Sequence, residues 1–207
     1  MKAGAFSRFS CHVEPIELQD GICSERVSVI QDRANPFFYW SNTRGVLVCP
    51  PHGMHTDFGS IPKAIQRIPH LDRMTFAPSY ILHDCLYWFR YALRPRICVE
   101  LEQGDSGLLH LTGAKLACLL DGIFEPNDNK RVAMYMEEFF VVPVTRLWCD
   151  GLLNEMMYVQ TRGDAVWERP VVQTGLFLGG WVPWWLHARR KAGSDDLPPL
   201  DHEICTA

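Results

Sequence analysis

The chain has 207 residues, of which 47% are hydrophobic and 12% aromatic, and its formal net charge at pH 7 is -4. This length and apolar content suit one globular domain with a sizeable core and additional segments, and they exclude an intrinsically disordered chain. The negative balance and the scatter of Lys and Arg provide no basic surface, so we expect no nucleic-acid partner.

The cysteines and the first residues of the chain indicate the cellular compartment in which the protein is made. Residues 1–13 contain no continuous apolar stretch of the kind that forms a signal peptide, so we expect synthesis in a cytoplasm without export by that route. The eight cysteines form no C-x-x-C pair and no zinc-finger spacing. This favours reduced, structural thiols. The alternative is a few disulfides that form later, in an assembled extracellular particle.

The first third of the chain predicts short β-strands separated by turns. The candidate strands cover His12–Leu18, Arg26–Gln31, Phe37–Trp40 and Gly45–Cys49. Between the last two, Ser41–Gly45 has the residue types of a hairpin turn. Pro51–Ser60 contains two glycines and predicts a loop, after which Ile61 and Pro62 open a short helix to about Ile68.

The middle of the chain predicts helices. They cover Ser79–Ala92, Thr112–Phe124, Asp128–Phe140 and Pro143–Tyr158, with a loop from Gly163 to Arg169. The first of these helices is apolar around most of its circumference, which predicts burial on most sides. The fold class is therefore α+β, with short N-terminal antiparallel strands and a hairpin packed on a cluster of about four to five helices. We expect an N-terminal extension over 1–35, a core domain over 36–160 and a C-terminal extension over 161–207.

An uncharged segment distinguishes the C-terminal part. Residues 171–186 carry no charge, and Arg189, Arg190 and Lys191 follow. A membrane-spanning helix needs about 20 apolar residues, and this segment is shorter and is interrupted by Gly179, Gly180 and Pro183. It predicts docking on the chain's own core or on a partner subunit. The alternative is an interfacial membrane anchor, with the tryptophans at headgroup level.

A small set of polar residues stands out in apolar surroundings. His83 and Asp84 are adjacent within the first predicted helix, and Tyr87 lies one turn beyond His83 on the same face. Buried polar groups are costly unless they find partners, so we expect these side chains to meet other polar groups. The loop that carries Asp57 and Ser60 is one source of partners. Asp121, the one acid in an apolar helical run, is expected to need a buried partner as well.

These residues resemble a phage and prophage family, catalogued as domain of unknown function 1353. The family pattern joins a T-D-x-x-S-I-P stretch, an H-D-x-L-Y stretch and an A-D-x-x-F-like helix. The first two are matched here by Thr56-Asp57-Phe58-Gly59-Ser60-Ile61-Pro62 and by His83-Asp84-Cys85-Leu86-Tyr87. The third is similar to Leu120-Asp121-Gly122-Ile123-Phe124, with leucine where the family tends to have a smaller residue. The resemblance covers about residues 37–152 and implies phage origin, an α+β fold and a shared polar cluster without an established activity.

Two chemical interpretations of the polar cluster remain open beside an architectural one. Asp57, His83, Asp84 and Asp121 have the ligand types of a divalent ion such as Zn, Mn, Fe or Mg, and an open coordination position would activate water for hydrolysis. Tyr87 or Ser60 would then orient the substrate. His52 and His55 add metal-like spacing but lie outside the family pattern. The second interpretation is a metal-free binding pocket, and the third is a hydrogen-bonded network that only fixes the loop.

Two functions from different classes follow. One is a metal-assisted hydrolase that acts for a phage on the cell wall or another host component. The other is a structural component of the virion, of tail or baseplate type, made in the host cytoplasm and docked on other phage subunits through residues 171–186. The segments outside the family-like core favour the particle component, whereas the Asp/His motif favours the hydrolase.

Overall fold

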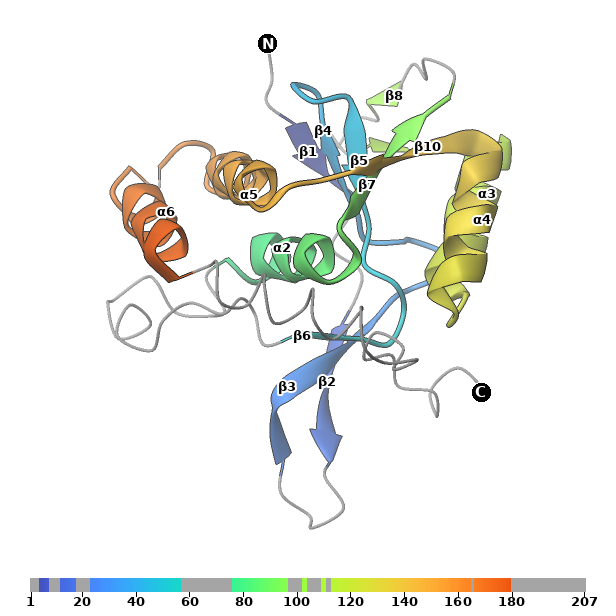
Figure 1. The fold of residues 1–207 in the computed structure, drawn as a ribbon, viewed down its shortest axis with the longest axis horizontal. Helices are drawn as coiled ribbons and strands as arrows, with labels where there is room; N and C mark the ends of the chain where they lie inside the picture. The colour runs from blue at the N-terminus through green and yellow to red at the C-terminus, as the bar shows by residue number, and fades with distance from the viewer. Residues whose placement is uncertain are drawn as a thin grey trace.

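The computed structural model describes residues 4–7, 12–17, 23–56, 76–96, 102–103, 109–110, 113–164 and 166–179. Within these residues the chain forms five helices and antiparallel sheets, with the N-terminal strands packed on the helices (Figure 1). The α+β fold class that the sequence predicts is confirmed.

The main sheet has five antiparallel strands in the order β1-β4-β5-β7-β10. The strands are β1 (Gly4–Phe6), β4 (Tyr39–Ser41), β5 (Val46–Val48), β7 (Tyr91–Pro95) and β10 (Phe139–Pro143). The predicted hairpin is confirmed, because Tyr39 pairs with Val48 and Gly45 takes a φ of 60° in the turn. A positive φ is sterically strained for most residues that have a Cβ atom, and glycine adopts it without that strain.

A second, three-stranded sheet has the order β2-β3-β6, and a small β8–β9 pair stands apart from it. These strands are β2 (His12–Glu17), β3 (Cys23–Ile30), β6 (Met54–Thr56), β8 (Glu102–Gln103) and β9 (Leu109–His110). Part of the segment for which the sequence predicts only a loop, Pro51–Ser60, is thus a strand. The segment predicted as an N-terminal extension supplies β1 to one sheet and β2 and β3 to the other.

The helices are α2 (Ala77–Phe89), α3 (Gly113–Phe124), α4 (Asp128–Glu138), α5 (Arg146–Gln160) and α6 (Glu168–Gly179). Helix α2 is confirmed, but it ends at Arg90 in a left-handed conformation with φ of 60°, so the predicted extension to Ala92 is wrong. The helix predicted to run through Phe140 ends at Glu138, because the next residues pair with β7. The predicted helix 61–68 lies outside the described residues.

The starts of α5 and α6 differ from the prediction. Helix α4 begins at Asp128 as predicted, and Asn127 caps it by accepting a hydrogen bond from the Lys130 amide. Pro143 ends β10 instead of opening a helix, and the side chain of Thr145 caps α5. Helix α6 starts within the predicted loop 163–169. In the described part of the chain, no helix combines the length and apolar character that crossing a membrane requires.

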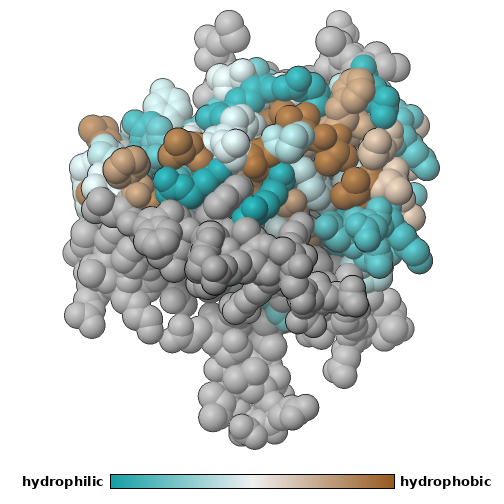
Figure 2. Space-filling model, viewed as in Figure 1, coloured by the Kyte–Doolittle hydropathy of each residue, from teal (hydrophilic) through white to brown (hydrophobic). Residues whose placement is uncertain are grey.

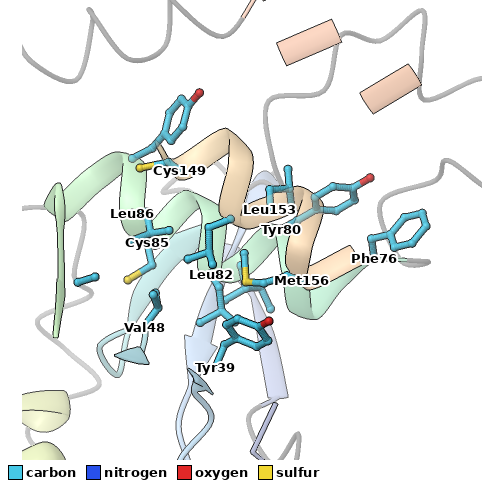
Figure 3. Close-up of a cluster of buried hydrophobic side chains, with 14 of the residues drawn as sticks. Tyr39, Val48, Phe76, Tyr80, Leu82, Cys85, Leu86, Cys149, Leu153 and Met156 are labelled. Carbon is cyan, nitrogen blue, oxygen red and sulfur yellow. The ribbon is translucent and has the colours of Figure 1, made fainter. Parts of the chain in front are cut away.

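The core is built around α2, which packs against α5 and against strands β5 and β6 (Figure 1). Figure 3 shows side chains of the sheet (Tyr39, Val48), of α2 (Leu82, Cys85, Leu86) and of α5 (Cys149, Leu153, Met156) meeting in one cluster. Nearly every residue of α2 is buried, which confirms the predicted burial on most sides. Any polar side chain on α2 must therefore find its partner inside the protein.

Glu155 fixes α5 against the β4–β5 hairpin. Its carboxylate accepts hydrogen bonds from the hydroxyls of Tyr39 (2.8 Å), Ser41 (2.7 Å) and Thr43 (2.6 Å). Charge-assisted hydrogen bonds of this kind are stronger than neutral ones. They hold the helix that carries Asp150 in a defined position over α2.

Candidate functional site

The polar side chains of α2 meet Asp150, which α5 supplies. His83 and Tyr87 are both buried, and their rings, one turn apart, are tilted by 43° with centroids 4.3 Å from each other. The Asp150 Oδ1 atom lies 3.1 Å from His83 Nε2 and accepts a hydrogen bond of 2.6 Å from the Tyr87 hydroxyl. An ionised carboxylate only accepts hydrogen bonds, so we assign the histidine proton to Nε2.

Asp150 also connects α5 to α6. Its Oδ2 atom lies 3.5 Å from Nη1 of Arg146, one turn earlier on α5, and that same nitrogen donates to the Leu176 carbonyl at 3.1 Å. From α6, the Gln173 amide donates to the Asp150 backbone carbonyl at 2.8 Å. We call Asp150, His83, Tyr87, Arg146 and Gln173 the Asp150 network. Through the carboxylate and the backbone carbonyl of Asp150, the network joins α2, α5 and α6.

Asp84 faces a different neighbour. Consecutive residues of a helix point roughly 100° apart, so His83 and Asp84 address different surroundings. The hydroxyl of Thr56, the last residue of β6, donates to Asp84 Oδ2 at 2.5 Å. The two adjacent polar residues of the H-D pair therefore serve separate contacts, one toward α5 and one toward β6.

Burial sets the protonation of the groups near this site. It raises the pKa of Tyr87 well above its usual range, and the hydrogen bond to Asp150 adds to the shift, so the phenol stays a neutral donor. Burial likewise raises the pKa of Cys149 and of Cys85, and that of Cys49 to about 12. These thiols, all free, are therefore protonated, which leaves them poor nucleophiles.

The expectation that His83, Asp84 and Tyr87 meet polar partners is confirmed. Asp57 and Ser60 lie outside the described residues. Asp121 does not join this cluster: its side chain is 56% exposed and pairs with Arg33 at 3.1 Å. The expectation of a buried partner for Asp121 is wrong, because this turn of α3 faces solvent.

The two additional candidate ligands, His52 and His55, make local contacts. His52 Nδ1 accepts a hydrogen bond from the Gln31 amide at 3.3 Å, and its ring lies 4.8 Å from that of Phe124. That contact occupies one of the two nitrogens that could bind a metal. His55 lies in β6, half-buried, and its backbone pairs with Ser28 of β3.

The described residues do not assemble the predicted ligand set. Among them, no three His, Cys, Asp or Glu side chains are grouped closely enough to hold a metal ion. His83, Asp84 and Asp121 are all described, so these three do not form a metal site by themselves. Asp57, the fourth predicted ligand, lies outside the described part of the chain.

Asp150 is the residue that sequence reasoning missed. The helix predicted over Pro143–Tyr158 includes Asp150 without assigning it a role, yet Asp150 is buried at the centre of the network. A signal was present, because Asp150 stands among apolar residues of α5 and follows Arg146 by one turn. The same argument selected Asp121, which is exposed, so an acid in an apolar run does not by itself reveal burial.

None of the known protein families, curated proteins or solved structures that we compared with this chain matches it. The resemblance of its motifs to the phage family therefore stays a prediction, and the site has to be interpreted from its own geometry.

Replacing the two acids separates their roles. We expect Asp150→Ala to lower the free energy of unfolding by about 3–5 kcal/mol, because it leaves buried donors and the Arg146 charge without their acceptor. Asp121→Ala, which removes an exposed ion pair, should cost less than about 1 kcal/mol. Urea unfolding of both variants measures the difference, and equal losses would show that Asp150 is not the centre of the network.

The phenol of Tyr87 gives a pH-dependent test. Because its folded-state pKa lies above the unfolded value, its contribution is fully present below about pH 10 and is lost as the pH rises further. Tyr87→Phe should cost about 1–2 kcal/mol at pH 7. Above about pH 10 that cost should shrink by about 1.4 kcal/mol per pH unit. The unfolding free energies of wild type and variant are measured in parallel, so that the contributions of the other tyrosines and cysteines cancel in the difference. A cost of Tyr87→Phe that stays constant with pH would contradict the buried, neutral phenol.

Proposed function

We propose that this chain is a structural component of a phage particle that docks on other subunits through the helical hairpin α5–α6. The observation that carries the proposal is the exposure of large apolar side chains on this hairpin and its connection. Leu147 is 64% and Phe177 68% exposed, and Tyr158 and Trp167 are each 46% exposed. Exposed apolar residues gathered on one element are typical of interfaces.

The hairpin groups these side chains at its two ends. Arg146, at the start of α5, contacts the end of α6, while Arg169, at the start of α6, lies 4.9 Å from the ring of Tyr158 near the end of α5. The two helices are therefore antiparallel. Leu147 and Phe177 belong to one end of the hairpin, and Tyr158 and Trp167 belong to the other.

The segment predicted to dock, residues 171–186, is described as far as residue 179. Val172 and Leu176 of α6 are buried in the chain's own core, whereas Phe177 points away from it. One face of α6 thus binds its own domain and leaves another face for a partner. The Asp150 network supports this role, because Arg146 and Gln173 hold α6 in place, and a preorganised surface binds with a smaller entropic cost.

The assignment to a phage particle rests on the motif resemblance. His83, Asp84, Leu86 and Tyr87 of the H-D-x-L-Y stretch lie on α2. In this proposal the motif serves architecture, because His83 and Tyr87 hold α5 and Asp84 holds β6. The hydrogen-bonded network is then a device that fixes the docking helices.

Particle incorporation tests the proposal. We expect the chain to be found by mass spectrometry in purified particles from a producing culture, and Phe177→Ser to reduce its incorporation at least about tenfold. Thr174→Ser, at another exposed position of α6, is the matched control and should incorporate normally. Absence of the wild-type chain from the particles, or equal behaviour of the two variants, would contradict the proposal.

A second candidate, the hydrolase, is favoured by one observation. In the described part of the chain, Asp150 is the hydrogen-bond partner of His83, and it takes Nε2. Nδ1 then carries a lone pair and has no described partner. An imidazole held by a carboxylate on one nitrogen and carrying a lone pair on the other has the arrangement of a general base.

Metal content and activity separate the two candidates. Under the particle proposal, protein purified without chelator should contain far less than one metal ion per chain and should not degrade cell-wall material. The control is His83→Gln, which keeps a hydrogen-bonding side chain on α2. Near-stoichiometric metal and cell-wall hydrolysis in wild type, both lost in a folded His83→Gln variant, would establish the hydrolase instead.

A further inference from the structure

Strand β10 forms an open edge of the main sheet. It pairs with β7 over its whole length, from Phe139 opposite Pro95 to Pro143 opposite Tyr91, and it is the last strand in the sheet order. Its other side has no partner among the described strands. In Figure 1 it crosses the front of the sheet between α4 and α5.

The hydrogen bonds at its two ends show which backbone groups face outward. The Arg96 amide donates to the Glu138 carbonyl at 3.0 Å, and the Val144 amide donates to the Arg90 carbonyl at 3.0 Å. Antiparallel strands alternate hydrogen-bonded and non-hydrogen-bonded pairs. The even-numbered residues therefore bond to β7, and the backbone groups of Phe139, Val141 and Pro143 face the open edge.

Only one of these three residues has a free donor. The Phe139 amide caps α4 by donating to the Tyr135 carbonyl, and proline has no N–H. Val141 thus offers the single outward N–H of β10 and, beside it, an outward carbonyl. A donor and an acceptor on the same residue form the pair that two identical strands exchange across a two-fold axis.

The side chains of the edge are apolar, and Pro143, at the end of the strand, is its one edge-protecting residue. Strand β10 contains no charged residue and no bulge, which are common protections of edge strands. Phe140 is 48% exposed, and Phe140 and Val142 share a face because side chains alternate along a strand. Figure 2 shows hydrophobic side chains at the surface where β10 runs between α5 and α4.

We infer that β10 pairs antiparallel with β10 of a second copy of this chain, with the two-fold axis at Val141. The two Val141 residues exchange a pair of N–H···O hydrogen bonds. In this register Phe140 lies opposite the partner's Val142 and Val142 opposite the partner's Phe140. Both pairs are aromatic on β-branched, a favourable cross-strand combination. The strand itself carries no charge, and the charged groups beside Phe140 are Arg94, opposite it on β7, and Arg96, whose guanidinium lies 4.6 Å from the ring centroid.

This interface is separate from the α5–α6 docking surface, so an experiment can disprove one of the two proposals without disproving the other. Sedimentation velocity of the full chain should show a monomer–dimer equilibrium over micromolar concentrations. In hydrogen exchange followed by fragmentation mass spectrometry, the Val141 amide should become protected as the dimer forms, since it has no acceptor within the described part of the monomer.

Charge substitutions test the register. Phe140→Lys and Val142→Glu, each alone, should weaken the dimer at least about tenfold. Mixed together, they should form a heterodimer, because the register places the introduced lysine opposite the introduced glutamate. Phe177→Lys, an equally drastic change of an exposed aromatic on α6, is the control and should leave the dimer unchanged.

A wild-type chain that stays monomeric throughout this range would overturn the inference. That result would also cover the case in which a strand of another protein binds the edge of β10. So would a dimer that survives Phe140→Lys, or one that Phe177→Lys weakens equally. Failure of the mixture to recover the dimer would exclude the Val141-centred register.

Discussion

Everything around the candidate site depends on the need to pair polar side chains on a helix that has no solvent face. Helix α2 is buried along nearly its whole length, yet it carries His83, Asp84 and Tyr87. Leaving such groups unpaired costs more than a typical hydrogen bond returns. The elements that surround α2 must therefore bring complementary groups, and they do so with Asp150 from α5 and Thr56 from β6.

The same requirement recurs wherever the chain buries a polar group. Glu155 collects three hydroxyls of the β4–β5 hairpin. Arg131, fully buried, donates to the carbonyls of Gly122 and Glu125 at the end of α3. Glu155 joins elements distant in sequence, whereas Arg131 joins the consecutive helices α3 and α4, so the positions of α5 and α3 follow from polar contacts as well as from apolar packing. The Asp150 network extends this to α6, which links the motif on α2 to the exposed residues of the helical hairpin.

The two proposed surfaces differ in physical character. The α5–α6 hairpin offers apolar side chains on a helix pair that the Asp150 network holds in place, a surface suited to a subunit of different sequence. The β10 edge offers a backbone donor and acceptor at one residue, a surface suited to an identical strand. A chain with both would form a symmetric pair and present two hairpins to its surroundings.

The sequence by itself determined the features that are encoded locally. The apolar pattern predicts α2, and the turn residues Ser41–Gly45 predict the hairpin. The polar groups of α2 must have partners because they are buried. The tertiary structure decided which partners these are. Asp121 and Asp150 stand in similar apolar runs, but only Asp150 faces α2, since α3 turns its acid to solvent. Strands β7 and β10 likewise exist because they pair with each other across 44 positions between Pro95 and Phe139, and no local pattern reports a partner that far along the chain.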